Sequence, residues 1–167
     1  KLNDQLGFLL GEEKKKEMGR VIDRLETRLG GWARGELTLM IIVGSANYIG
    51  LSLLGIPYAL PLAILAGLLE IIPNLGPITA SIPGIIIGLS ISPVMGLAVA
   101  ALALLIQQLE NYILVPKIME KSVGVSPLIT LLALAIGLKI AGVVGAILAI
   151  PATITLQVIA SEYLVSK

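Results

Sequence analysis

The sequence predicts an all-α, polytopic helical membrane protein with an N-terminal amphipathic helix and short hairpins broken by proline and glycine. Three observations carry this prediction. Hydrophobic residues make up 56% of the 167 positions, and the mean hydropathy is +0.97. More than half of the charged residues precede Arg34, and apolar runs of helical length then follow one another to the C-terminus. A polar surface could not keep such a chain in water, so a lipid bilayer is the expected solvent and partner.

Residues 12–31 form the amphipathic helix. Its apolar residues recur at steps of three and four, as on one face of an α-helix: Met18, Val21, Ile22, Leu25 and Leu29. Gly30 and Gly31 are expected to end it. Two placements remain open, on the cytoplasmic membrane surface or against a neighbouring element of the same protein. The chain accordingly divides into a surface helix with its linker, 1–35, and a transmembrane transport domain, 36–167.

Six apolar runs follow within the transmembrane domain. They are Leu37–Leu54, Tyr58–Ile72, Ile78–Leu89, Val94–Val115, Pro127–Leu138 and Val143–Leu164. About 20 residues cross a bilayer, so the second, third and fifth runs are too short to span comfortably. Trp32 is expected at the membrane interface before the first run.

Two pairs of these runs are interrupted in a similar way. In the first pair Pro73, Asn74, Gly76 and Pro77 form a tip that is followed by Pro83. In the second pair the tip is 139–142, between Gly137 and Gly145, and Pro151 follows. Freed backbone groups are costly in lipid unless protein or water covers them, and paired breaks indicate a transporter's substrate site. The pattern favours re-entrant or discontinuous helices, and ordinary hairpins with proline kinks remain the alternative.

Polar side chains inside the fourth run form a second candidate site. Gln107, Glu110 and Asn111 share one face of the predicted helix. A carboxylate at the bilayer centre costs about 2.5–3.5 kcal/mol, so it is expected to face a cavity, bind a cation or proton, or pair. The alternative is that Glu110 reaches the headgroups near Pro116. Glu70, beside the first break, is a weaker candidate of the same kind.

Other function classes are excluded by composition. A net charge of +1, with bases and acids intermixed, gives no case for nucleic acid. The chain has no cysteine and no histidine, which removes disulfides, thiol nucleophiles, histidine triads and His/Cys metal sites. No cofactor motif and no convincing catalytic constellation is present, so we expect neither an enzyme nor a metal site.

The basic residues predict the orientation. Arg34, Lys117 and Lys121 mark the inner side, which places both ends of the chain in the cytoplasm. The chain begins with Lys1 rather than methionine, and it is expected to be part of a longer protein.

Several motifs occur in an order that resembles a known family. They are GGWARGEL at 30–37, IPNLGP at 72–77, QQLEN at 107–111, LVPKI at 114–118, SVGVSP at 122–127 and GAILAIP at 145–151. Together they resemble the autoinducer-2 exporter family of bacterial and archaeal permeases, from about residue 15 onward. The tip residues of the first break, Glu110, Asn111 and Pro116 match its signature positions. The pair Leu138–Lys139 and Glu120 depart from it.

The resemblance implies an inner-membrane protein about twice this length, with further N-terminal helices. It also implies a homo-oligomer, likened to elevator-type transporters. Some members export autoinducer-2, and others resemble sodium(lithium)/proton antiporters.

We therefore expect secondary transport of a small solute, a monovalent cation or a proton, by the C-terminal part of a permease. The alternative is a membrane scaffold or anchor domain that transports nothing. The expected pathway residues are Glu70, Pro73, Asn74, Gly76, Pro77, Pro83, Gln107, Glu110, Asn111, Gly137 and Pro151. The two tips are expected to meet near the bilayer midplane.

Overall fold

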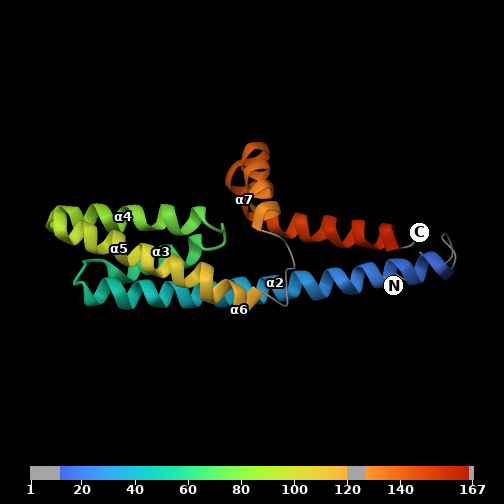
Figure 1. Ribbon diagram of the computed structural model, residues 1–167, viewed down its shortest axis with the longest axis horizontal. Coiled ribbons are helices and arrows are strands. Elements are labelled where there is room, and N and C mark those ends of the chain that lie inside the picture. Colours follow the sequence, from blue (N-terminus) through green and yellow to red (C-terminus); the bar gives the residue numbers. More distant parts are fainter. Residues whose placement is uncertain (1–11, 120–126, 166–167) are drawn as a thin grey trace. The chain divides into compact units, whose positions relative to one another are not determined.

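The computed structural model describes residues 12–119 and 127–165 of the chain. Every regular element in these ranges is a helix, which confirms the predicted all-α class (Figure 1). By length and composition, three helical stretches within the described residues can cross a membrane, Met18–Leu53, Pro93–Met119 and Leu128–Glu162. The apolar helices between the first two are shorter, as expected. The predicted connector beyond residue 119, with Glu120 and Lys121, lies outside the described residues, as do both chain ends.

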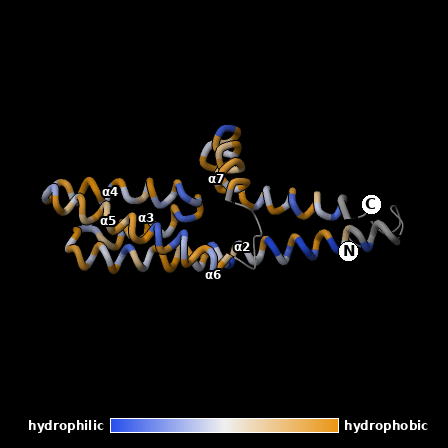
Figure 2. Tube along the Cα trace, in the orientation of Figure 1, coloured by the Kyte–Doolittle hydropathy of each residue, from blue (hydrophilic) through white to orange (hydrophobic). Residues whose placement is uncertain are grey.

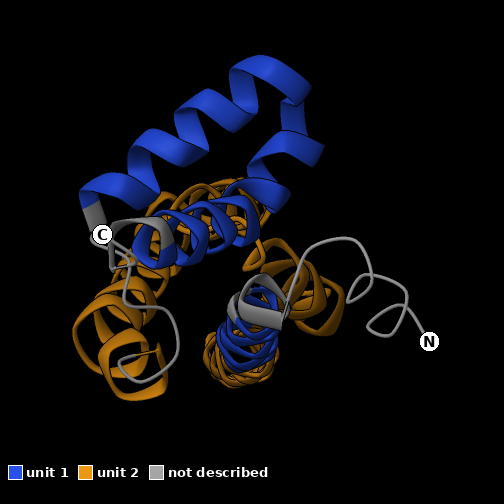
Figure 3. Ribbon diagram, turned by 90° about the vertical axis from the view of Figure 1, so that its right-hand side faces the viewer, with its two compact units in different colours: residues 1–32, 122–167 blue, residues 33–121 orange. Residues whose placement is uncertain are grey.

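The chain divides into two compact units, which Figure 3 shows in different colours. Unit 1 comprises residues 1–32 and 122–167, and unit 2 comprises residues 33–121. Helix α2, Glu12–Leu53, contributes to both. The division at residue 35 that the sequence suggests stays a prediction.

Helix α2 does not end at Gly30 and Gly31, so the expected stop is wrong. It runs without interruption through 42 residues, which corresponds to about 63 Å at 1.5 Å per residue. Among the described glycines only Gly55 and Gly142 have positive φ, so the pair lacks the left-handed conformation of a C-cap. Figure 2 shows hydrophilic residues along the first part of α2 and mainly hydrophobic ones along the second.

Within unit 1, the apolar face of α2 packs against helix α7, Pro127–Val165. The residues in this contact are Val21, Leu25, Leu29 and Trp32 from α2, and Ile150, Ile154 and Val158 from α7. Arg20 and Arg24 extend the contact by pairing with the buried Glu162. Of the two placements of the amphipathic helix, the structure therefore supports the one against a neighbouring element. Trp32, expected at the membrane interface, belongs to this contact.

Helix α7 consists of two helical arms that form a hairpin. Its backbone leaves the helical region between them, at Ala141 (φ −135°, ψ 20°) and Gly142 (φ 59°, ψ −140°). The glycines on either side of this break face each other closely. A Cβ on Gly137 would collide with the backbone of Gly145, and the reverse substitution would collide as well. Gly142 has a φ that L side chains rarely adopt. The predicted second tip is thus present, at 141–142.

Unit 2 contains the second part of α2, then α3 (Ala59–Leu69), α4 (Leu75–Ile91) and α5 (Pro93–Leu109). A π-helical turn, η1 (Glu110–Leu114), continues α5 into α6 (Val115–Met119). The α2–α3 and α4–α5 connections lie at one end of these helices, and the α3–α4 tip lies towards the other (Figure 1). Ser92 caps α5, since its hydroxyl accepts a 3.1 Å hydrogen bond from the Met95 amide and Pro93 occupies the first turn.

Small residues bring these helices into close contact. Gly44 of α2 meets Gly67 of α3, and a Cβ on Gly67 would lie 2.8 Å from the Met40 carbonyl oxygen. Gly88 of α4 meets Gly96 of α5 in a similar way, with Gly96 Cα 3.1 Å from a Cβ built at Gly88. Close backbone approach through glycine is typical of membrane helices. A cluster of Leu51, Ile56, Leu62 and Val99 fills the interior.

The prolines after the tips do not break the helices, contrary to the expectation for Pro83 and Pro151. Pro83 lies inside the continuous α4, and α7 continues through Pro151. Each helix can continue because a proline removes only one amide donor and neighbouring groups can accommodate the freed carbonyl. The interruptions are the tips themselves.

Candidate functional site

The α3–α4 tip, residues 70–77, is the interruption that brings polar groups into unit 2. Asn74 has φ 65° and ψ −43°, a positive φ that few non-glycine residues adopt. The turn satisfies part of its own backbone, because the Gly76 amide donates to the Ile72 carbonyl at 2.8 Å and the Leu75 amide donates to the Pro73 carbonyl at 2.8 Å. A break inside lipid requires such internal pairing.

Local sequence explains the shape of this tip. Pro73 cannot donate a backbone hydrogen bond, so the helix of α3 does not continue through it. Gly76 is required because a Cβ there would collide with the Leu69 carbonyl group. Pro77 stands in the first turn of α4, where amide groups lack intrahelical partners in any case. These three residues make the chain reverse direction within a few positions.

Three buried glutamates meet beside the tip. Glu36 comes from α2, Glu70 from the end of α3 and Glu110 from the start of η1, and their exposed fractions are 5%, 2% and 4%. The Glu70 and Glu110 side chains are hydrogen-bonded to each other. Glu36 lies close enough for its charge to act on Glu70 and for that of Glu110 to act on it. We call these residues the glutamate cluster.

The hydrogen bond between Glu70 and Glu110 fixes the chemistry of the glutamate cluster. An ionised carboxylate only accepts hydrogen bonds, so a bond between two carboxyl groups requires a proton on one of them. One oxygen of each residue, Glu70 Oε2 and Glu110 Oε2, is buried without a hydrogen-bond partner. Such orphaned acceptors are costly in a low-dielectric interior and attract a donor or a proton.

Positive charge does not neutralise the glutamate cluster. The ion pairs formed by the described residues are those of Glu162 with Arg20 and Arg24, in unit 1. Arg34 and Lys117, the basic residues nearest in sequence to Glu36 and Glu110, are exposed. Within residues 12–119 and 127–165, no group of acidic residues has the arrangement of a metal site. Within the described residues, the glutamate cluster is therefore a group of buried acids without a basic partner.

The three polar residues predicted to share one face of the fourth run differ in burial. Glu110 points into unit 2, whereas Gln107 is half-buried and Asn111 is exposed. The π-helical turn begins at Glu110, so the spacing expected for an α-helix does not hold there. The structure thus brings Glu110 to Glu70 and does not bring Asn111 to the same place. Pro83 lies within α4, away from the turn itself.

Gly137 and Pro151 belong to unit 1, where they lie on the two arms of the α7 hairpin. The predicted meeting of the two tips therefore stays a prediction. Glu36 is the residue of the glutamate cluster that sequence reasoning missed. It is not among the pathway residues expected from the sequence. Its place directly before an apolar run of spanning length was the available signal.

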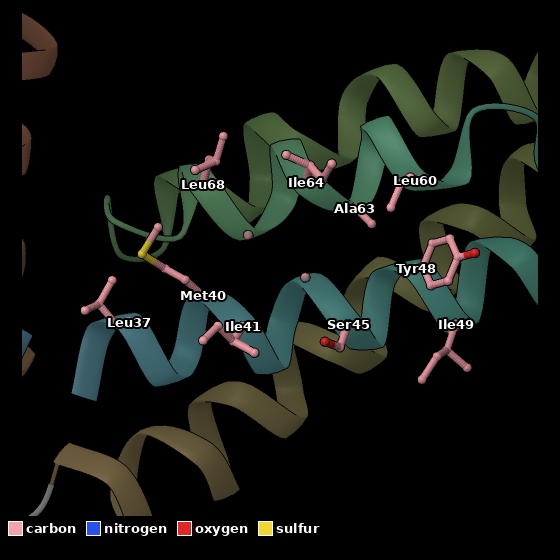
Figure 4. Close-up of a pocket in the computed structure, with 12 residues that line it drawn as sticks. Leu37, Met40, Ile41, Ser45, Tyr48, Ile49, Leu60, Ala63, Ile64 and Leu68 are labelled. Atoms are coloured by element: carbon pink, nitrogen blue, oxygen red, sulfur yellow. The ribbon is translucent and has the colours of Figure 1, made fainter. Parts of the chain in front are cut away.

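A groove between α2 and α3 adjoins this region of unit 2 (Figure 4). It has a volume of about 490 Å³. Leu37, Met40, Ile41 and Ile49 line it from α2, and Leu60, Ile64 and Leu68 line it from α3. The hydroxyl groups of Ser45 and Tyr48 are its polar contribution from side chains. Such a surface suits apolar chains of lipid or protein, and it lacks the groups that would orient a polar solute.

Comparison with known proteins decides the family. The sequence model of the family described as "AI-2E family transporter" matches residues 1–165. The chain belongs to the AI-2E transporter family. This confirms the resemblance, and together with the three candidate spans it makes the chain a multi-pass membrane protein.

Curated relatives in the AI-2E family carry transport names. "Putative transport protein YrrI" of Bacillus subtilis is 32% identical over 157 residues, which cover 94% of this chain and 44% of the relative. "Putative transport protein YueF" of the same organism is 33% identical, with 79% and 36% covered. "Putative transport protein MT0215" of Mycobacterium tuberculosis is 37% identical, with 72% and 33% covered. The chain spans less than half the length of each of these relatives.

Proposed function

We propose that this chain is part of a secondary transporter that moves a small solute or ion across the cytoplasmic membrane, with the α3–α4 tip and the glutamate cluster on the transport pathway. The observation that carries this proposal is the hydrogen-bonded pair Glu70–Glu110, buried in an apolar helical unit. Buried acids inside membrane segments are expensive, and they are retained where an ion or proton passes. The transport names of the relatives support the same function.

The broken hairpins support a transport pathway for a second reason. Interrupted helices expose carbonyl and amide groups that bind ions and polar solutes at membrane depth. In the described part of the chain, apolar hairpins are interrupted at Asn74 and at 141–142. Autoinducer-2, or sodium or lithium in exchange for protons, are the cargoes that the family resemblance suggests. A homo-oligomer is part of the same proposal.

The arrangement of unit 2 supports the proposed orientation. Gly35 packs against Met119, so Arg34 and Lys117 lie towards the same end of the unit as the α3–α4 tip. Basic residues mark the cytoplasmic side. We therefore place this end of unit 2 on the cytoplasmic side, and the charge pattern of the sequence places both ends of the chain there as well.

The proposal is tested by Glu110→Gln in the full-length protein, reconstituted in vesicles. Solute and ion swaps are applied across the membrane while flux is recorded. We expect flux to fall at least about tenfold, because a neutral amide cannot take up or release the proton that the pair shares. Glu26→Gln is the matched control, since Glu26 is exposed on α2.

Unchanged flux and unchanged ion dependence in Glu110→Gln would remove the pair from the transport mechanism. A protein in which no solute or ion moves, and in which Asn74 and Glu110 substitutions alter only stability, would be a scaffold or anchor instead.

A further inference from the structure

The α3–α4 tip is held in place by a small set of interactions. Its backbone has a strained, positive φ at Asn74, and the hydrogen bond from Glu70 to Glu110 links it to η1. Ile72, within the tip and two residues from Glu70, is only 9% exposed. Loss of this hydrogen bond would remove the link to η1, and the strain at Asn74 would then favour movement of the tip.

We propose that the glutamate cluster is a proton-binding latch: the proton shared by Glu70 and Glu110 holds the α3–α4 tip closed, and its loss, beside Glu36, opens the tip. This proposal extends the proposed function, because the latch has a role in transport only if the tip lies on the transport pathway. Its test reads the position of the tip rather than flux, so the two proposals fail separately.

The proton balance of the latch is simple. In the closed state one carboxyl group donates its hydrogen to the other carboxylate, and the pair carries one negative charge. When that proton leaves to water, two carboxylates face each other without a donor between them. Like charges at this distance repel strongly in a medium of low dielectric constant. Separation of α3 from η1, with entry of water, relieves the repulsion.

Among the described residues, no cation pairs with Glu70. Helix α2 presents Glu36, a third acid, and η1 presents Glu110. Arg34 and Lys117 are exposed and form no ion pair with the cluster in the described part of the chain. Loss of a proton therefore concentrates negative charge at the tip. A carboxyl pair that hydrogen-bonds directly also leaves no room between its oxygens for a metal ion, so a proton is the ligand.

Cysteine accessibility tests the latch directly, because the chain contains no cysteine. Ile72→Cys places a thiol at this buried position of the closed tip. Glu26→Cys places a control thiol at an exposed position of α2 that precedes the apolar run. Both are made in the full-length protein, with any cysteines outside this chain replaced, and reacted with N-ethylmaleimide in proteoliposomes. The ratio of the two rates removes the pH dependence of the thiol itself.

We expect this ratio to rise about tenfold or more from about pH 5 to about pH 9, as a two-state equilibrium biased by one proton requires. With Glu70→Gln and Glu110→Gln together, amide groups keep a hydrogen bond that no pH change removes, so the thiol stays protected throughout. With Glu36→Gln the midpoint of the rise moves to lower pH, since one negative charge no longer opposes ionisation of the pair.

A ratio that does not change with pH would overturn the latch. So would an equal rise in the double glutamine variant, because the opening would then come from other groups. Glu110→Ala, which lacks the latch, is expected to be accessible at low pH; if it does not fold, the double glutamine variant still decides.

Discussion

Glu70 stands where two costly features coincide, a carboxyl group and a broken helix, and each reduces the cost of the other. The turn at Asn74 lets α3 end at Glu70, so this side chain reaches Glu110. A hydrogen-bonded pair that shares one proton and carries a single negative charge is less expensive to bury than two separate carboxylates. The break therefore gives the acid its partner, and the proposed latch would in turn hold the break in place.

Gly76 is the residue on which the shape of the tip depends most directly. Gly76→Ala would place a methyl group against the Leu69 carbonyl, so we expect it to lower the free energy of unfolding by about 1–3 kcal/mol or to displace the tip. Thermal unfolding in detergent measures the loss. The matched control is Gly19→Ala on α2, where nothing lies within 4 Å and alanine should stabilise the helix. Equal stability of the two variants would mean that the tip is not tightly packed.

At the scale of elements, the first half of α2 is an amphipathic helix with an intramolecular partner. Its apolar residues contact α7, and Arg24 Nη1 lies 2.7 Å from the buried Glu162 Oε2, with Arg20 Nε 3.3 Å from Oε1. Charge-assisted hydrogen bonds to a buried carboxylate are stronger than surface pairs. Both the apolar stripe and the arginines of α2 are thus used within unit 1.

Glu162→Gln is expected to weaken this α2–α7 contact by about 1–2 kcal/mol, because the amide keeps the volume but loses the charge that both arginines face. Trp32 offers the measurement. It is the single tryptophan of the chain and packs in the same contact, so its emission reports the separation of α2 from α7 during unfolding. Glu26→Gln, exposed on α2, should leave the unfolding midpoint unchanged. A shift of equal size in both variants would show a general charge effect.

For the whole molecule, the features that could be predicted from the sequence are those that depend on hydrophobic composition and on the positions of interruptions. The all-α class, the short hairpins, the tip at Pro73–Pro77 and the two acids Glu70 and Glu110 all followed from apolar runs and their interruptions. What could not be predicted depends on contacts between distant segments. Glu36 is buried beside Glu70 and Glu110, which come from distant segments, and the exposure of Asn111 next to the buried Glu110 depends on how η1 packs in unit 2.

The continuity of α2 is the least predictable feature of the whole molecule, because glycine is both a helix terminator and a tolerated interior residue. Gly30 and Gly31 lie at the boundary between the two units, on the helix that belongs to both. Glycine pairs are weak points where helices bend. We therefore expect α2 to flex there rather than to act as a rigid rod.

Gly30→Ala combined with Gly31→Ala should stiffen this boundary, since each alanine stabilises a helix interior by about 0.5–1 kcal/mol relative to glycine. Spin labels at the exposed Glu26 and Ser45, both on α2, are about 28 Å apart along a straight helix. The distribution of label distances should be broad in the unaltered protein and narrower in the double variant. Gly19→Ala stabilises the same helix inside unit 1, so it should raise stability without narrowing the distribution. Distributions of equal width in all three proteins would make α2 one rigid rod, and any movement between the units would then have to arise outside it.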